Sequence, residues 1–190
     1  LQANLNDATP RRQSESISMA GNGDTGVTVE LDWLPPMLTL SGTWEEIVST
    51  LYAIFEKDFK QAKPKFQHYV IGWDQRLLPG QHYEEGFWHL ISRDDKSTGE
   101  RLPDFRRAER LPWCGPTIVH SDDSAVIVWD YRERKGRLHT YLWLEDRDYC
   151  IILKKLKRVA QPVAMLITAF HVDGPSRRRN LRSKLARREP

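Results

Sequence analysis

Four apolar runs in the second half of the chain limit its possible folds more than any other feature. They cover residues 124–133, 137–145, 148–156 and 162–172, and they are rich in β-branched and aromatic side chains. Short polar links separate the runs, so that strand signals recur at the spacing of roughly ten residues that is typical of antiparallel sheets. The pattern therefore predicts a four-stranded antiparallel meander.

An amphipathic helix is predicted ahead of these strands, within residues 40–61. An apolar series that runs from Trp44 to Phe55 recurs at helical spacing. Thr43 and Glu46 have the spacing of a capping box, in which each side chain accepts a hydrogen bond from the other residue's backbone N–H. We interpret the apolar stripe of this helix as part of the core.

Shorter elements are predicted between this helix and the sheet. Residues 68–74 predict a strand, and residues 87–93 fit either a strand or a helix. A helix is predicted within residues 103–113. Pro103 opens it, and it ends before Pro112. An earlier alternating run, residues 27–34, predicts an edge strand. The segments that join these elements are predicted to be loops.

The chain is predicted to divide into a leader and one domain. Residues 1–27 are polar and cannot bury enough apolar surface to order themselves, so we expect a disordered leader. Residues 28–190 then form a single α+β domain, with N-terminal helices packed on the four-stranded antiparallel sheet. A basic helix follows over residues 176–189, with Ser176 as its N-cap.

The charge of the chain is strongly asymmetric. Residues 1–150 hold 18 Lys or Arg and 24 Asp or Glu, whereas residues 151–190 hold 11 and 2. A basic end is typical of a protein that binds a polyanion such as nucleic acid, although a solvated terminal helix has the same composition. The candidate nucleic-acid-binding residues are Arg177, Arg178, Arg179, Arg182 and Lys184.

Composition and missing motifs exclude several classes of protein. No apolar run approaches the roughly 18 residues of a membrane span, so we expect no membrane contact and a cytoplasmic location. Cys114 and Cys150 form no CxxC pair, which predicts buried free thiols in a reducing compartment. The sequence contains no phosphate-binding glycine loop, no HExxH and no GxSxG. We therefore expect no cofactor and no metal site.

The most informative segment for chemistry runs from His89 to Trp113. Apolar anchors surround His89, and Ser92, Arg93, Arg101, Arg106, Arg107 and Arg110 follow it. A histidine can move protons to or from the oxygens of a phosphodiester, and guanidinium groups can stabilise the charge that develops on phosphorus. Each of these residues can equally be structural, as a hydrogen-bonded histidine or a surface arginine.

Two further candidates come from the strands. Thr168 places a hydroxyl within an apolar strand, where it must find a hydrogen-bond partner, and that partner is either a phosphate or a neighbouring protein group. Alternation puts Thr168 and His171 on opposite faces of this strand. Lys155 lies in a basic cluster at a strand end, which could orient a phosphate or simply be an exposed hairpin end.

The order of these segments resembles the phage- and toxin-associated nuclease-like domains of the barnase–EndoU–colicin–RelE (BECR) group. The similar segments are FWHLISR, ERLPW, YLWLEDRDYCIILKK and LITAFHVDGPSRRRNLRSKL, within residues 38–188. The resemblance implies N-terminal helices on a four-stranded antiparallel sheet. It also implies metal-independent RNA cleavage that leaves a 2′,3′-cyclic phosphate, with catalytic positions at His89, Arg110, Lys155 and Thr168.

The leading hypothesis is a small endoribonuclease that serves as a toxin or as a phage or defence effector. Its substrate would be RNA, with tRNA as one candidate, and a neutralising protein is a candidate partner. The main alternative is a non-catalytic module that binds nucleic acid or an acidic protein. Convergence of His89, Arg93, Arg110 and Thr168 in one pocket would favour the enzyme, and scattered positions would favour the binding module.

Overall fold

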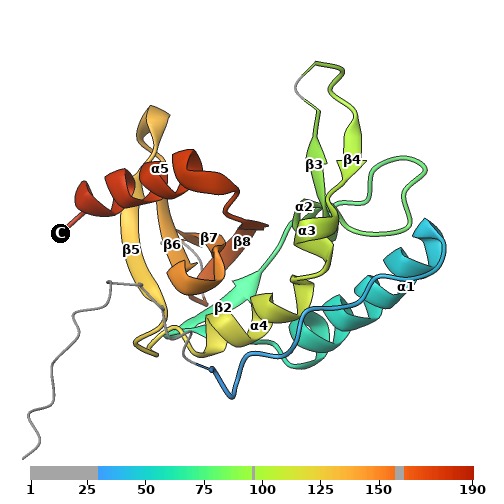
Figure 1. Ribbon diagram of the computed structural model, residues 1–190, viewed down its shortest axis with the longest axis horizontal. Helices are drawn as coiled ribbons and strands as arrows, with labels where there is room; N and C mark the ends of the chain where they lie inside the picture. Colours follow the sequence, from blue (N-terminus) through green and yellow to red (C-terminus); the bar gives the residue numbers. More distant parts are fainter. Residues whose placement is uncertain (1–29, 96, 157–160) are drawn as a thin grey trace, which may run out of the picture.

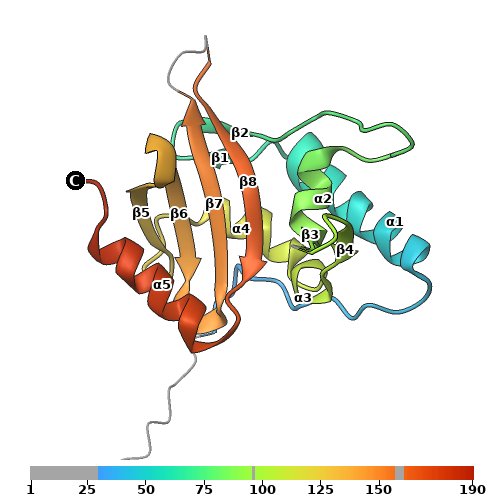
Figure 2. The same cartoon turned by 90° about the horizontal axis from the view of Figure 1, so that it is seen from above.

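The computed structural model describes residues 30–95, 97–156 and 161–190, which form an α+β fold around a six-stranded mixed sheet (Figures 1 and 2). The sequence had predicted four strands, all antiparallel, so both the number of strands and the purely antiparallel pairing were wrong. From one edge to the other, the strands are β1 (Lys65–Phe66), β2 (Tyr69–Gly72), β8 (Val163–His171), β7 (Tyr149–Leu156), β6 (Leu138–Leu144) and β5 (Ile127–Arg132).

The two extra strands come from the first half of the chain. The four predicted runs are β5 to β8, which pair antiparallel in chain order. The predicted strand at residues 68–74 is also present, as β2, but it pairs in parallel with β8 and places Ile71 opposite Ala164. Strand β1 extends the edge by a tight antiparallel hairpin onto β2. The parallel pairing of β2 with β8 could not be predicted from the local sequence, because the two strands are far apart in the chain and no tight turn joins them.

A separate two-stranded hairpin occupies a segment that the sequence predicted to be mainly loop. It consists of β3 (Ser92–Asp94) and β4 (Arg101–Pro103). The Asp95 carboxylate accepts a hydrogen bond from the Ser97 backbone N–H at 2.7 Å, which helps to close the turn. The predicted strand at residues 27–34 is wrong for residues 30–34, which form a turn and irregular backbone. Residues 1–29, including the predicted leader, lie outside the described ranges.

Helix α1 (Trp44–Phe55) confirms the predicted amphipathic helix. Thr43 caps it and forms both hydrogen bonds of the capping box with Glu46. The chain continues as a π-helical segment, η1 (Glu56–Gln61), which keeps Phe59 in line with the buried face of the helix. The aromatic and aliphatic stripe is therefore core, as the sequence indicated.

The predicted helix at residues 103–113 was wrong, because two shorter helices cover this region. Pro103 belongs to β4, and Arg110 interrupts the helical backbone. Pro112 stands in the first turn of the second helix, where proline needs no hydrogen-bond partner for its nitrogen, so it opens a helix instead of ending one. The helices after η1 are α2 (Glu85–Ile91), α3 (Phe105–Ala108), α4 (Leu111–Val119) and α5 (Gly174–Ala186), with 3₁₀ turns η2 (Arg134–Gly136) and η3 (Glu145–Arg147).

The basic C-terminal helix is present as α5, but its predicted N-cap was wrong. Asp173, not Ser176, holds the N-cap position, because Gly174 and Pro175 already belong to the first turn. The helix lies over one face of the sheet, with Leu181 buried against Trp129, Tyr141 and Trp143.

The other face of the sheet carries the larger core. It packs against α2 and α4, and α1 packs on α4 in turn, with Leu51 of α1 and Ile118 of α4 fully buried. Cys114 and Cys150 are buried and free, as expected. No helix within the described ranges is long and apolar enough to cross a membrane.

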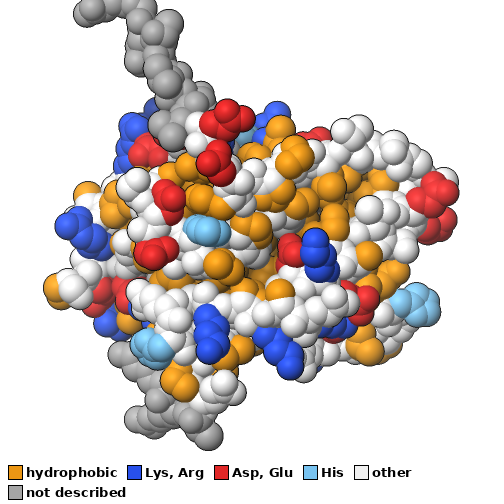
Figure 3. Space-filling model, turned by 90° about the horizontal axis from the view of Figure 1, so that it is seen from below, with side chains coloured by type: hydrophobic (Ala, Val, Ile, Leu, Met, Phe, Trp, Pro, Cys, Tyr) orange, Lys and Arg blue, Asp and Glu red, His pale blue; other side chains and the backbone are white. Residues whose placement is uncertain are grey.

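The face of the molecule opposite α5 has no concentrated basic surface. Figure 3 shows apolar side chains over much of this face, with Lys, Arg, Asp and Glu scattered among them. Met37 and Phe105 are large exposed apolar residues, with 48% and 54% of their surface accessible. The basic side chains that matter for a polyanion therefore have to be sought on the side of the molecule that carries α5.

Leu181→Ala should destabilise the protein by about 2–5 kcal/mol, because it leaves a cavity between α5 and the aromatic residues of the sheet. Urea unfolding followed by tryptophan fluorescence measures this change. Arg179→Ala, on the exposed side of the same helix, is the control and should change stability by less than about 0.5 kcal/mol. Equal effects of the two changes would contradict the packing described for α5.

Candidate functional site: a basic groove along α5

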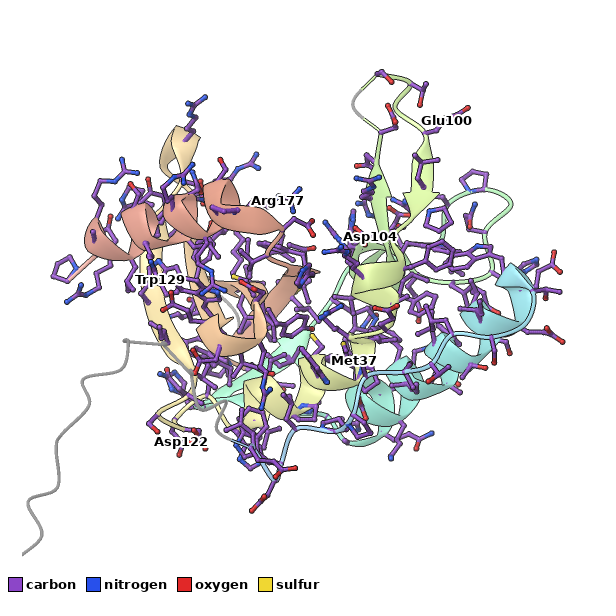
Figure 4. All side chains as sticks on the ribbon, viewed as in Figure 1. Met37, Glu100, Asp104, Asp122, Trp129 and Arg177 are labelled. Carbon is purple, nitrogen blue, oxygen red and sulfur yellow. The ribbon has the colours of Figure 1, made fainter. Side chains whose placement is uncertain are left out.

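A cavity of about 630 Å³ lies between the β3–β4 hairpin, α3 and the first turn of α5; we call it the His89 cavity. Figure 4 shows Arg177 on α5 and Asp104, which caps α3, on opposite sides of this space. Its lining combines His89 and Ser92 with three arginines and four aspartates: Arg93, Arg107, Arg177, Asp94, Asp95, Asp104 and Asp173.

His89 stands on α2, whose position is fixed by the chain that follows β2. Gly86 at the start of this helix donates its backbone N–H to the Asp74 carbonyl at 2.8 Å. A side chain at Gly86 would collide with Trp73, since a Cβ there would lie 2.8 Å from the Trp73 Cβ. The glycine therefore lets α2 approach closely, and His89 on its last turn reaches the cavity with 43% of its side chain exposed.

A buried carboxylate stands behind His89. The Glu85 Oε2 lies 4.0 Å from the His89 Nε2, one helical turn away. Arg101 makes two hydrogen bonds of 2.8 Å to Glu85, and these hold the pKa of that carboxyl below its ordinary value in spite of burial. Glu85 therefore remains a carboxylate at neutral pH, and it lies close enough to His89 to orient the imidazole.

Arg107 connects the helical half of the molecule with the sheet. Its guanidinium donates hydrogen bonds to the His89 carbonyl at 3.0 Å and to the Thr168 hydroxyl at 3.1 Å. Its Nε also lies 3.3 Å from the Asp104 carboxylate. The pKa of Arg107 lies below its ordinary value, mainly because of burial. The nearby Arg177 and Arg93 also lower it, and the pair with Asp104 opposes them. The group still remains charged at neutral pH, because arginine starts from so high a value.

Thr168 reaches this cluster through an irregularity in β8. Ile152 pairs with Thr168, but Leu153 pairs with Leu166, so Ile167 is an extra residue in the strand. The bulge reverses the alternation, and Thr168 turns to the side of α5, away from the core face that Leu166 occupies. There its hydroxyl donates to the His89 carbonyl at 3.2 Å. The hydroxyl therefore has its hydrogen-bond partners within the protein.

Two more cavities continue from the first along α5. A central cavity of about 460 Å³ shares Arg107 and Arg177 with the His89 cavity. A third, of about 570 Å³, shares Tyr141 and Lys184 with the central one and contains His139; we call it the His139 cavity. We call the three together the basic groove. It passes between α5 and the strands beneath it.

Three of the five predicted catalytic residues meet at the groove, and two do not. His89 and Arg93 line the His89 cavity, and Thr168 lines the central one. Arg110 lines none of the three cavities; its guanidinium donates to the Arg106 carbonyl and lies 5.3 Å from the centre of the Trp113 ring.

Lys155 is the second residue outside the groove. It forms a 2.8 Å ion pair with Asp130, whose other oxygen accepts a 2.6 Å hydrogen bond from the Thr140 hydroxyl. These contacts give Lys155 a structural role in joining β7 to β5 and β6.

The five predicted binding residues on α5 are also divided. Arg177 and Lys184 line the groove. Arg178 pairs with Asp148 and Arg182 with Glu145, each at 2.5 Å, which fastens α5 to the turn between β6 and β7. Arg179 is exposed and has no ion-pair partner in the described part of the chain.

Arg107 is the central residue that the sequence did not single out. It stands among several arginines in the segment, and only its spacing from Asp104, which predicts a helical (i, i+3) ion pair, sets it apart. Its contacts with His89 and Thr168 join parts of the chain 18 and 61 residues away. No local sequence pattern predicts contacts between residues so far apart in the chain.

Comparison with known proteins gives no further guide to this site. No protein-family model matches the chain, and neither a curated protein nor a solved structure is significantly similar to it. Within the described ranges, no group of three or more His, Cys, Asp or Glu side chains is arranged to hold a metal ion. The function has therefore to be argued from the groove itself.

Stability should fall as the pH drops below about 6.5, because His139 and His171 both resist protonation in the folded protein. Burial is the main reason that the pKa of each lies below its ordinary value of 6.5. The unfolded chain then binds more protons than the folded one at mildly acidic pH, so acid favours unfolding. Urea unfolding at pH 7.5 and pH 5 should show a smaller loss in the His139→Gln, His171→Gln double variant than in the wild type. An unchanged loss would contradict this origin of the pH dependence.

Proposed function

We propose that this protein is an endoribonuclease that cleaves RNA in the His89 cavity by acid–base transphosphorylation. The observation that carries the proposal is the meeting of one partly exposed imidazole, His89, with three guanidinium groups in a single cavity. The three are Arg93, Arg107 and Arg177. A phosphodiester needs a proton-transfer group and cationic ligands, and this cavity holds both, beside the four carboxylates of Asp94, Asp95, Asp104 and Asp173.

The reaction needs few groups. The ribose 2′-oxygen attacks the phosphorus, its proton passes to His89, and the bond between the phosphorus and the 5′-oxygen breaks. The attacking and leaving oxygens lie on opposite sides of phosphorus, so His89 serves the 2′-oxygen and water protonates the 5′-oxygen. The products are a 2′,3′-cyclic phosphate and a 5′-hydroxyl, and the protonated His89 returns its proton to solvent. No step calls for a metal ion, and the short segments that resemble the BECR group imply the same reaction.

The guanidinium groups differ in how free they are to bind phosphate. Arg107 is held by Asp104, His89 and Thr168, so it contributes fixed positive charge more than a new ligand. Arg93 has no ion-pair partner within the described ranges, and Arg177 pairs only loosely with Asp173, at 3.6 Å. Arg93 and Arg177 are therefore the groups that we assign to the phosphate oxygens.

Glu85 and Thr168 act through other residues in this proposal. Glu85 lies behind the imidazole and orients it. Thr168 bonds the His89 carbonyl and the Arg107 guanidinium, and so fixes the distance between the histidine and its positive surroundings. Both are positioning residues. RNA of unspecified sequence is the proposed substrate, with tRNA as a candidate, and a neutralising protein is a candidate partner.

His89→Ala should reduce RNA cleavage by about 10²–10⁴-fold, the range that a positioned acid–base group contributes. The assay follows total tRNA and rRNA incubated with purified protein in the presence of EDTA. His82→Ala, an exposed histidine outside the groove, should cleave at the wild-type rate and serves as the matched control. Lys155→Ala should lower stability without lowering the rate per folded molecule. Equal cleavage by wild type and His89→Ala would overturn the proposal.

A non-catalytic nucleic-acid-binding module is the second candidate. The observation that favours it is the position of Arg110 and Lys155, which the BECR resemblance implies are catalytic and which lie outside the groove. Such a module would bind RNA through the groove and leave it intact. Binding without cleavage by the wild-type protein would select this function.

A further inference from the structure

We infer that the His139 cavity is a second nucleic-acid subsite, which holds the flanking nucleotides of a single-stranded RNA that runs along α5 from the His89 cavity. The inference rests on the proposed function for the class of its ligand, and it extends that function from one phosphodiester to a strand. It assigns a role to a set of residues at the far end of the groove that the cleavage step does not use.

The first argument is the continuity of the groove. Arg107 and Arg177 line both the His89 and central cavities, and Tyr141 and Lys184 line both the central and His139 cavities. Arg177 stands in the first turn of α5 and Arg187 is its C-cap, ten residues later. At 1.5 Å per helical residue they are about 15 Å apart along the axis. Successive nucleotides of a stacked strand rise by only about 3.4 Å, so the groove can accept more than one nucleotide.

The second argument is the charge of the His139 cavity. Lys184 is neutralised by Glu133 at 2.5 Å, and both groups also bond the Tyr141 hydroxyl. This leaves three guanidinium groups in excess, and Glu133 is the one carboxylate among the residues that line the cavity. The three are Arg134, Arg137 and Arg187.

The three guanidinium groups are available to a ligand. Arg134 and Arg137 are exposed, and neither has an ion-pair partner in the described part of the chain. Arg187 donates only to Ser183 within its own helix. Exposed guanidinium groups without carboxylate partners, concentrated in one cavity, are suited to bind successive phosphates.

The third argument is the presence of flat side chains that can stack on bases. The guanidinium of Arg187 lies 5.7 Å from the centre of the Tyr131 ring, and the Lys184 ammonium lies 5.2 Å from the same centre. Both Tyr131 and Arg187 line the cavity. Aromatic rings and guanidinium planes are the side-chain groups on which unpaired bases stack, whereas the bases of a duplex are already stacked on one another. These groups favour a single strand.

The experiment compares two double variants of equal charge. Arg134→Glu, Arg137→Glu changes the His139 cavity, and Arg179→Glu, Arg188→Glu changes exposed arginines of the same C-terminal region that line none of the three cavities. Both are made in the His89→Ala background so that bound RNA survives. Fluorescence anisotropy then measures the affinity for a uridine dinucleotide, a uridine decanucleotide and a ten-base-pair RNA duplex. Circular dichroism confirms that each variant is folded.

The cavity variant should bind the decanucleotide at least about tenfold more weakly than its parent and show a smaller salt dependence, because it loses phosphate contacts. Its affinity for the dinucleotide should be unchanged, and the control variant should lose less than about twofold. Equal losses in the two variants, equal losses for the two lengths, or no binding of the decanucleotide by the parent would overturn the subsite. Tighter binding of the duplex would overturn the single-strand assignment. If the wild type binds the decanucleotide through these arginines but does not cleave it, the proposed nuclease function fails while the subsite stands.

Discussion

The partly buried guanidinium of Arg107 is the contact on which the groove depends, because it joins α2 and α3 to the sheet beside the candidate site. It comes from α3, bonds the backbone of α2 at His89, and bonds the side chain of Thr168 on β8. Its Nη1 has both of these partners, whereas its Nε makes no hydrogen bond within the described ranges and relies on the 3.3 Å ion pair with Asp104, so all the partners have to be in place together. The position of His89 relative to the sheet is thus fixed by the same interaction that supplies positive charge to the cavity.

The elements that form the core could be predicted from the sequence, and the way they assemble could not. Helix α1 and the four strands β5 to β8 follow from apolar periodicity and short links, because both are local properties of the chain. The parallel pairing of β2 with β8 has no such local mark, and neither does the bulge at Ile167. The helix boundary at Pro112 was predicted wrongly, because a proline is found both just after the end of a helix and in the first turn of a helix. The sequence alone does not distinguish these two positions.

Part of the candidate site could also be predicted from the sequence. His89, Arg93 and Thr168 could be selected because their residue types are unusual in their surroundings, and all three reach the groove. Arg110 and Lys155 were selected as members of basic clusters, and the resemblance implied the same positions, but each is held by local contacts outside the groove. Arg107 could not be separated from its neighbours, because its role depends on three elements that converge only in the folded chain. The bulge explains Thr168 in particular, since regular alternation would have turned its hydroxyl into the core.

The basic composition of the C-terminal region has two separate physical uses. Arg178, Arg182 and Lys184 are paired with carboxylates at the ends of β5, β6 and β7, and these pairs hold α5 against the sheet. The cations that face the groove come from distant places in the chain: Arg93 on β3, Arg134 and Arg137 between β5 and β6, Arg177 in the first turn of α5 and Arg187 at its C-cap. The positive groove is therefore a property of the folded molecule and not of the tail alone. Any change that loosens α5 from the sheet must weaken the fold and separate these charges at the same time.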